Sequence, residues 1–210
     1  MIIICYISLW QSNDGLIYRF VHYRCTLYPY NVESKTEIAV FGGGCFWCTE
    51  AIFSELKGVL KVIPGYTGGL SDNPTYQQVC GGNTGHVEAA RIEYDPELIS
   101  YNDLLGVFFC THDPTTPNRQ GNDVGEQYHS TIFYVDNAQK EASEKCIAKL
   151  NASGDYHSPI ITSLKPLTRF YEAEDYHQRY YENNAAQPYC RAIIAPKMAK
   201  FRAKFKDSLK

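Results

Sequence analysis

The sequence predicts an α+β fold, a two-layer sandwich in which helices and long coil flank a mixed central sheet. Two observations favour this class. An apolar run at 38–41 is followed at once by three glycines and then by a helical pattern, as where a strand turns into a helix. Farther along, strand and helix patterns neither alternate strictly nor separate into blocks, which disfavours a doubly wound sheet.

The first strand and helix are the most sharply predicted elements. Residues 38–41 indicate a buried strand, and the glycines at 42–44 indicate a turn where backbone segments pass closely. Apolar and polar positions then repeat at intervals of three and four, at Cys48, Ala51, Ile52, Glu55 and Leu56. This spacing predicts an amphipathic helix that ends near Gly58, with Cys45 at its N-terminus.

The later elements follow from alternation, β-branched content and turn residues. In order, we expect a strand over 59–63, a polar Gly-rich loop that carries Tyr76, a strand over 86–94, a helix over 101–110, a Pro- and Thr-rich loop over 113–120, a strand over 128–135, a helix over 137–150, short strand or coil pieces over 159–173 and a short aromatic-rich helix over 174–181. Glu88 shares one face of its strand with Ala90, Ile92 and Tyr94.

Residues 1–35 mix apolar and aromatic residues without a period, so we expect an N-terminal extension of unknown order and one catalytic domain over 36–210. The opening MIIICYISLW lacks a basic region and a small-residue cleavage site. We therefore expect neither a signal peptide nor a membrane-spanning helix.

Composition excludes several classes of partner. The chain carries 20 Lys plus Arg against 23 Asp plus Glu, and no long run of either sign, so neither nucleic acid nor a membrane is expected to bind it. Its eight cysteines in a chain without a signal peptide indicate a reducing compartment with mostly free thiols. We expect a cytoplasmic monomer.

Cys45 is the main candidate nucleophile. Unpaired backbone N–H groups and the positive end of the helix dipole favour a thiolate at a helix N-terminus, so we expect the pKa of Cys45 to lie below the usual ~8.5. A buried structural cysteine is the alternative. The preceding glycines and the following Phe46 and Trp47 disfavour it.

Four stretches together resemble a known family. They are GCFW from residue 44, TGHVEAARIEYDP from 84, HDPTTPNRQGNDVGEQYHS from 112 and AEDYHQRYY from 173. In this order they resemble the peptide methionine sulfoxide reductase A family. The resemblance implies a thiol enzyme that reduces methionine S-sulfoxide, in proteins or as the free amino acid, to repair oxidative damage. It also implies no bound cofactor or metal, and thioredoxin, or dithiothreitol in vitro, as the reductant.

By resemblance, Cys45 would attack the sulfoxide sulfur, and Phe46 and Trp47 would form an apolar pocket for the S-methyl group. Aromatic rings supply the apolar surface that a methyl group needs. The departing oxygen needs a proton, and Glu88 matches the family's acid. Burial raises the pKa of a carboxyl group, which would keep Glu88 protonated near neutral pH.

Three further residues match the family's site. Tyr76 and Tyr128 match two tyrosines that hydrogen-bond the sulfoxide oxygen, and phenol groups can stabilise a developing oxyanion while uncharged. Asp123 matches a carboxylate that organises this network.

Reduction leaves Cys45 as a sulfenic acid, which must condense with a second thiol to form a disulfide. Cys48 is one helical turn away, within the reach of a disulfide, but it also belongs to the apolar face of the helix. Cys190 lies where the family commonly places a recycling cysteine on a mobile segment, and we favour it. The family often has Gly at position 48 and Arg at position 129, and its Gly-rich tail with a further recycling cysteine is missing here. The remaining cysteines, at 5, 25, 80, 110 and 146, are assigned no role.

Two other classes fit parts of the pattern. Cys45-Phe-Trp-Cys48 at a helix start is also typical of a thioredoxin-like dithiol oxidoreductase, but disulfide exchange needs neither Glu88 nor the two tyrosines. A zinc-stabilised binding module would need a second pair of ligands, and the sequence has no second C-x-x-C motif.

Overall fold

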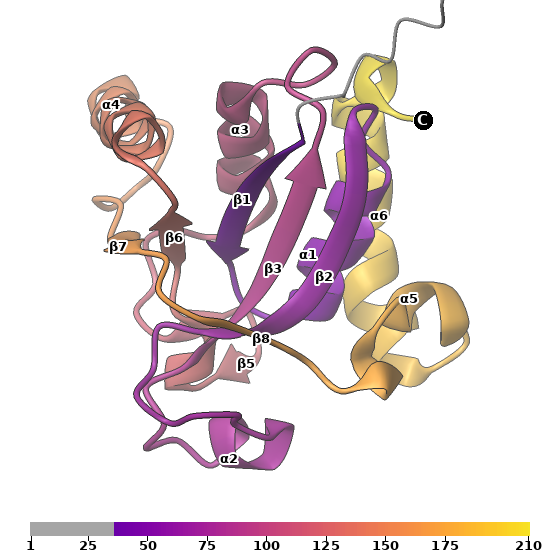
Figure 1. The fold of residues 1–210 in the computed structure, drawn as a ribbon. Helices are drawn as coiled ribbons and strands as arrows, with labels where there is room; N and C mark the ends of the chain where they lie inside the picture. The colour runs from indigo at the N-terminus through magenta and orange to yellow at the C-terminus, as the bar shows by residue number, and fades with distance from the viewer. Residues whose placement is uncertain (1–35) are drawn as a thin grey trace, which may run out of the picture. The chain divides into compact units, whose positions relative to one another are not determined.

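The fold is known from a computed structural model that describes residues 36–210. The extension expected over residues 1–35 lies outside the described residues, so the division into extension and catalytic domain stays a prediction. The described residues form a six-stranded sheet, a separate two-stranded sheet and several helices (Figure 1). The predicted α+β class is confirmed.

The main sheet has the strand order β7-β6-β1-β3-β2-β8. Its strands are β1 (Glu37–Gly42), β2 (Val59–Thr67), β3 (Val87–Tyr94), β6 (Thr131–Tyr134), β7 (Ser163–Pro166) and β8 (Phe170–Glu172). Only the β6 and β7 pair is parallel, so the sheet is mixed, as predicted. The short strands β4 (Arg119–Gln120) and β5 (Asp123–Val124) pair with each other.

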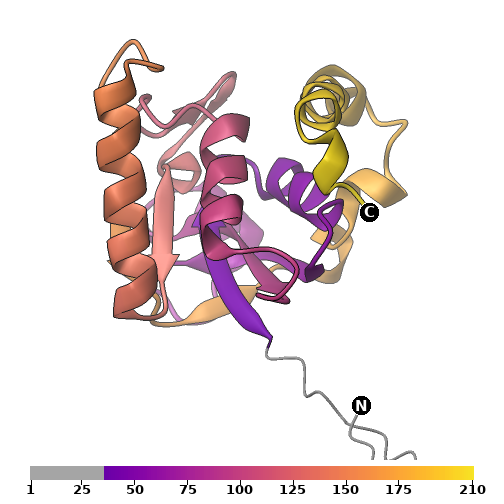
Figure 2. The ribbon, with the colours of Figure 1, turned by 90° about the horizontal axis from the view of Figure 1, so that it is seen from above.

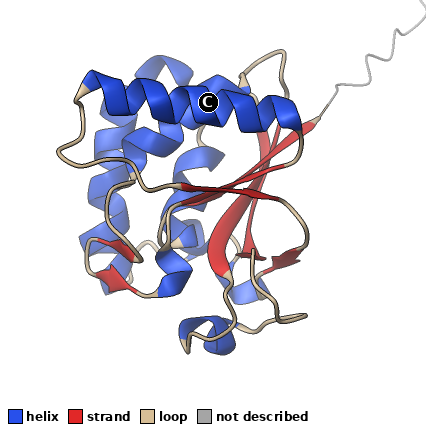
Figure 3. Cartoon of the chain, turned by 90° about the vertical axis from the view of Figure 1, so that its left-hand side faces the viewer, coloured by secondary structure: helices blue, strands red, loops and turns tan. Residues whose placement is uncertain are grey.

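Helices cover one face of this sheet (Figures 2 and 3). The α-helices are α1 (Phe46–Ser54), α2 (Tyr76–Cys80), α3 (Tyr101–Thr111), α4 (Asn137–Ser153), α5 (Tyr180–Asn183) and α6 (Ala195–Lys204). Four shorter helical segments are η1 (Glu126–Tyr128), η2 (Asp175–His177), η3 (Cys190–Ile194) and η4 (Lys206–Ser208). The main core lies between the sheet and α1, α3, α4 and α6, while a smaller apolar cluster lies on the other face.

The glycine turn between β1 and α1 sets the position of the helix start. Gly44 has φ +93°, a backbone conformation that residues with a side chain rarely adopt. A Cβ atom at this position would also lie 2.5 Å from the Gln120 side chain. A Cβ at Gly42 would lie 2.6 Å from Val87 on the adjacent strand. Glycine is therefore needed for β1 to lie against β3 and for the chain to turn directly into α1.

The structure differs from the predicted elements in several places. The short helix expected over 174–181 is divided into η2 and α5. Tyr76 opens the short helix α2 instead of lying in a loop, because Thr75 and Gln78 form a reciprocal capping box. Tyr128 lies in η1, and the strand expected from residue 128 begins only at Thr131. The C-terminal helices η3 and α6 were not predicted.

Candidate active site

Cys45 immediately precedes α1, so the predicted cysteine at a helix N-terminus is present. Its backbone carbonyl accepts hydrogen bonds from the N–H groups of Cys48 and Thr49 at 3.1 and 3.4 Å. The residue is buried, with 7% of its surface exposed.

The pKa expected for Cys45 is wrong. A hydrogen bond with the Cys48 thiol, then burial and the charge of Cys48, raise the pKa of Cys45 well above its usual value. The same hydrogen bond, followed by the positive charge of Lys197, lowers the pKa of Cys48 against the effect of burial. Cys45 and Cys48 therefore titrate as one coupled pair, in which the interaction favours a negative charge on Cys48 over one on Cys45.

Glu88 lies across from Cys45 on β3, and its side chain is 1% exposed. Its Oε2 accepts a hydrogen bond of 3.1 Å from the backbone N–H of Phe46, the first residue of α1. Burial, and then the nearby Cys45, raise the pKa of Glu88 well above its usual value, although the Phe46 N–H opposes this. The carboxyl group is thus held in its neutral, proton-donating form beside the sulfur.

Tyr76 and Tyr128 both lie close enough to Glu88 and Cys45 to interact with them electrostatically. Burial is the main cause that raises the pKa of each phenol, so both stay neutral hydrogen-bond donors. Tyr76 also hydrogen-bonds Cys80, a cysteine to which the sequence assigned no role. The structure therefore brings together the two tyrosines, the carboxyl group and the nucleophile candidate.

Asp123 is linked to Cys45 through Tyr189, which sequence reasoning missed. The Tyr189 hydroxyl donates a hydrogen bond of 2.8 Å to Asp123 Oδ2 and is also in hydrogen-bond contact with the Cys45 thiol. Tyr189 follows a proline near the C-terminus and lies 144 residues after Cys45. No local sequence pattern predicts a contact between the two residues. Its position directly before Cys190 was the only available signal.

The two residues predicted to form an aromatic wall, Phe46 and Trp47, differ in depth. Phe46 is almost fully buried against Tyr66, with ring centroids 5.7 Å apart, whereas Trp47 is partly exposed. The Trp47 indole stacks on Tyr180 at 3.6 Å and 7°, and Tyr189 meets it edge-on at 5.7 Å. Trp47 therefore forms the surface of the wall, and Phe46 supports it from below.

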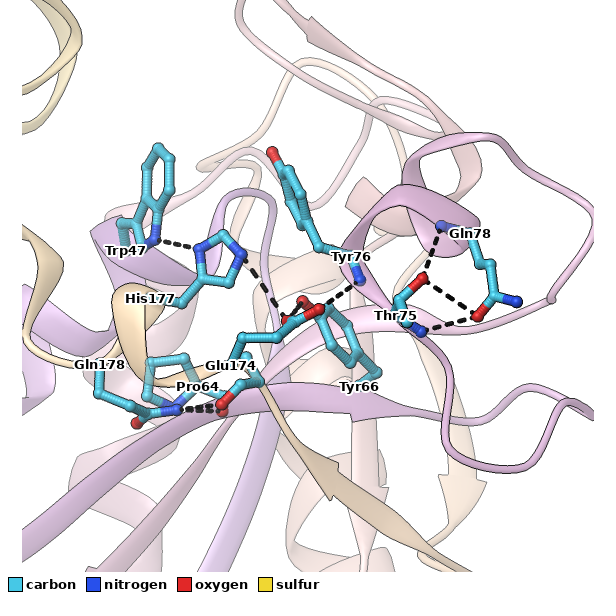
Figure 4. A network of polar contacts seen from close by, with 10 residues as sticks. Trp47, Pro64, Tyr66, Thr75, Tyr76, Gln78, Glu174, His177 and Gln178 are labelled. Atoms are coloured by element: carbon cyan, nitrogen blue, oxygen red, sulfur yellow. Dashed lines mark hydrogen bonds and ion pairs between the residues drawn. The ribbon is translucent and has the colours of Figure 1, made fainter.

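His177 holds the Trp47 indole in place (Figure 4). The indole Nε1–H donates a hydrogen bond of 3.1 Å to His177 Nδ1, so the neutral imidazole carries its proton on Nε2, which faces Glu174 at 3.9 Å. Burial lowers the pKa of His177, which keeps the ring neutral. Glu174 in turn accepts hydrogen bonds of 2.8 and 2.9 Å from the Tyr66 hydroxyl and the Tyr76 backbone N–H. This network joins the aromatic wall to α2.

Glu50, on α1, fixes the segment that carries Tyr180. Its side chain is 3% exposed, and its two oxygens accept hydrogen bonds of 2.6 and 3.2 Å from the backbone N–H groups of Arg179 and Tyr180. Arg179 has φ +52°, an uncommon conformation for a residue other than glycine. Burial raises the pKa of Glu50 to about 7. Glu50 thus holds a strained turn against the helix that bears Trp47.

Replacing Glu50 by alanine is expected to lower the free energy of unfolding by about 1–3 kcal/mol, because two backbone donors lose their acceptors. We also expect a higher KM, since Tyr180 would no longer be fixed on Trp47. Urea unfolding and steady-state kinetics measure the two effects. Glu182→Gln is the matched control, because Glu182 contacts the same arginine only through an exposed ion pair and should change little. Equal effects of the two variants would contradict the anchoring role.

The structure places both candidate resolving cysteines near Cys45, but in different settings. Cys48 is in hydrogen-bond contact with the Cys45 thiol, and Lys197 Nζ lies 3.9 Å from its sulfur. The Cys190 side chain is fully buried in the same core, although the neighbouring residues 185–188 and 191–192 are exposed. All six cysteines of the described residues have free thiols.

Metal-binding clusters and membrane-spanning helices are both absent from residues 36–210. No group of three or more histidine, cysteine, aspartate or glutamate side chains in this part of the chain is arranged to hold a metal ion. None of its helices combines the length and apolar character that a membrane span needs. The chemistry that the arrangement itself supports is thiol chemistry assisted by a neutral acid.

Comparisons with known proteins agree with this arrangement. Residues 37–209 match a family model described as "Peptide methionine sulfoxide reductase". Proteins called "Peptide methionine sulfoxide reductase MsrA" from Chromobacterium violaceum and Deinococcus radiodurans are 55% and 53% identical to this chain. The first alignment covers 82% of this chain and 98% of that protein, and the second 83% and 84%.

Solved structures are similar as well. Mxr1 from Saccharomyces cerevisiae in its reduced form superposes with a TM-score of 0.70 at 31% identity, over 75% of this chain and 91% of that one. Methionine sulfoxide reductase A of Corynebacterium diphtheriae superposes with a TM-score of 0.65 at 36% identity, over 72% and 76%.

Proposed function

Because this chain belongs to the peptide methionine sulfoxide reductase family and is a peptide-methionine (S)-S-oxide reductase, we propose that Cys45 is its nucleophile and Glu88 its acid. The observation that carries the assignment is the convergence of one sulfur and one neutral carboxyl group at the start of α1. A thioredoxin-like dithiol oxidoreductase and a zinc-stabilised module, the two alternatives, belong to families other than the one that this chain matches.

In the first half-reaction, the Cys45 sulfur attacks the sulfoxide sulfur while its proton passes to Cys48, the hydrogen-bond partner with the lower pKa. Glu88 donates a proton to the sulfoxide oxygen as the S–O bond of the substrate breaks. The released hydroxide then attacks Cys45 Sγ and breaks the bond between Cys45 and the substrate sulfur. Methionine leaves with the electron pair of that bond, and Cys45 becomes a sulfenic acid. The sulfoxide is thereby reduced by two electrons, and the cysteine is oxidised by two.

Tyr76 and Tyr128 supply hydrogen bonds to the sulfoxide oxygen as negative charge develops on it. Both phenols are neutral donors near Glu88 and Cys45, which supports this role. The pair formed by Asp123 and Tyr189 orients a hydroxyl group at Cys45. Trp47, supported by Phe46, provides the apolar surface for the S-methyl group.

Cys48 is our choice for the thiol that resolves the sulfenic acid, in place of Cys190, which the sequence favoured. The interaction between the Cys45 and Cys48 thiols supports it, because the two side chains lie near each other at the start of α1. A cysteine before α1 and a second one in its first turn also have the spacing of redox-active C-x-x-C pairs. Cys190 is fully buried and would need the η3 segment to move.

The disulfide formed in this way needs an external dithiol, and thioredoxin is the reductant we propose. The yeast relative has been solved in complex with Trx2. The substrates that the family name specifies are proteins and peptides with methionine sulfoxide. A cytoplasmic, monomeric enzyme that acts in the repair of oxidative damage fits a chain with free thiols.

Serine variants of the two candidate resolving cysteines separate their roles. With an S-sulfoxide peptide, Cys48→Ser is expected to lose turnover driven by thioredoxin and to keep turnover driven by dithiothreitol, which reduces the sulfenic acid directly. Cys190→Ser is the matched control and should keep both. The assay is methionine release with each reductant. Loss of thioredoxin-driven turnover in Cys190→Ser alone would return the resolving role to Cys190.

A further inference from the structure

Lys197 places a positive charge next to the proposed resolving sulfur. Its Nζ lies 3.9 Å from Cys48 Sγ, across the contact between α6 and α1. Met198 and Phe201 are buried in the core, so the helix that carries the lysine is fixed. Within residues 36–210, Lys197 takes part in none of the ion pairs with a carboxylate that the structure shows.

We propose that Lys197 is a positioning residue for the second half-reaction, in which its ammonium group holds the Cys48 sulfur as a thiolate ready to attack the Cys45 sulfenic acid. This inference rests on the proposed resolving role of Cys48. It adds Lys197 of α6 to the residues already proposed for the reaction.

The step balances without any further reactant. The Cys48 thiolate attacks Cys45 Sγ, an S–S bond forms and the S–O bond of the sulfenic acid breaks. Hydroxide leaves with the electron pair of that bond and takes up the proton that Cys48 had released, so the products are a disulfide and water. The Cys48 sulfur is oxidised while the Cys45 sulfur is reduced. An ammonium group beside the attacking sulfur raises the fraction of thiolate but does not enter the products.

Groups other than Lys197 also surround Cys48, and some favour its thiolate form while others oppose it. The Cys45 thiol favours the thiolate through a hydrogen bond, and the negative charge of Asp123, which accepts the Tyr189 hydroxyl proton, opposes it. Once Cys45 is a sulfenic acid, its thiol hydrogen bond is no longer available to Cys48. Lys197 then remains as the only cation among the groups that shift the Cys48 equilibrium in the described chain.

Lys200 provides a matched comparison. Both lysines line one cavity of about 690 Å³ that is also bordered by Asp123 and Tyr189. Both lie on α6, but only Lys197 contacts the Cys48 sulfur in the described residues. A change at Lys200 alters the charge of the same cavity without removing the contact.

The test measures how the Cys45 sulfenic acid divides between two fates. Reduced enzyme is mixed with an S-sulfoxide peptide and dimedone, without reductant, and mass spectrometry gives the ratio of dimedone adduct to disulfide at Cys45. This ratio does not depend on how fast the sulfenic acid forms. Loss of a cation at this distance should lower the thiolate fraction on the order of tenfold. A more basic thiolate is a better nucleophile, which offsets about half of that effect on a logarithmic scale.

Lys197→Met should therefore raise the ratio on the order of threefold at neutral pH. At alkaline pH Cys48 is ionised in both proteins and the more basic thiolate of the variant is the better nucleophile, so the difference should disappear and then reverse. Lys197→Arg should restore the wild-type ratio, and Lys200→Met should leave it unchanged. A Lys197→Met ratio equal to that of Lys200→Met at neutral pH would overturn the inference. Cys48→Ser, measured in parallel, tests the underlying assignment: if it still forms a disulfide at Cys45, the proposed role of Cys48 has failed instead.

Discussion

Replacing Cys45 by serine is expected to abolish the reduction of an S-sulfoxide peptide with both dithiothreitol and thioredoxin. No other thiol can take its place, because Glu88 and Tyr189 converge on this sulfur. A serine hydroxyl at the same position is a far weaker nucleophile and has no adjacent base of sufficient strength. Methionine release by the purified variant measures the effect.

Cys48→Ser is the matched control for this variant, since it changes a thiol to a hydroxyl one helical turn away and should keep activity with dithiothreitol. Unfolding by urea should be similar for both variants. Methionine release by Cys45→Ser with dithiothreitol at a rate close to that of Cys48→Ser would contradict the assignment of the nucleophile.

Replacing Glu88 by glutamine has the second largest expected effect, a decrease in kcat/KM of about 10²- to 10⁴-fold, the usual contribution of a positioned general acid. The amide keeps an oxygen to accept the hydrogen bond from Phe46, so the start of α1 should remain intact. Only the transferable proton is lost. Steady-state kinetics over a range of pH measure the change.

The pH dependence follows from the raised pKa of Glu88. Wild-type activity should fall as pH rises through that raised pKa, because the acid loses its proton, and Glu88→Gln should lack this decrease. The free energy of unfolding depends on pH with the same sign, because the folded protein binds the Glu88 proton more tightly than the unfolded chain does. The stabilisation from this proton is fully present below the pKa of Glu88 in the unfolded chain, near 4.5, and is lost as pH rises through its raised pKa in the folded protein. Above that pH, Glu88→Gln should therefore be more stable than wild type while being less active. A variant that is both less stable and unchanged in its pH profile would count against a neutral Glu88.

Sequence reasoning could predict the parts of the site that depend on local patterns. Three glycines between an apolar strand run and a helical repeat place Cys45 at the start of α1. Strict alternation over 86–94 places Glu88 on the buried face of β3. The position of Cys45 before α1 and the direction of the Glu88 side chain each depend only on residues within about ten positions in the sequence. The geometry of a helix or a strand determines how residues that close are arranged.

The charge state of Cys45 could not be predicted in this way. The helix N-terminus does favour a thiolate there, but the Cys48 hydrogen bond and burial outweigh it. Lys197, 149 residues from Cys48 in the chain, adds a positive charge beside the Cys48 sulfur. A contact of that separation arises only from the packing of α6 on α1.

The C-terminal part of the site was missed for a related reason. Tyr189 and Cys190 stand at the start of η3, where helical hydrogen bonds are spaced five residues apart, so the segment does not show the regular period of an α-helix. His177 lies in a motif that sequence comparison identified, but its hydrogen bond to Trp47 spans 130 residues. The residue types were visible in the sequence, and their partners were not.

The most direct test of the account is a single turnover of Cys48→Ser without reductant. Reduced enzyme is mixed with an S-sulfoxide peptide and dimedone, methionine is quantified, and the peptide that contains Cys45 is analysed by mass spectrometry. The account predicts one methionine for each enzyme molecule and a matching amount of dimedone adduct on Cys45. Methionine formed in that amount while Cys45 is recovered as an unmodified thiol would contradict it.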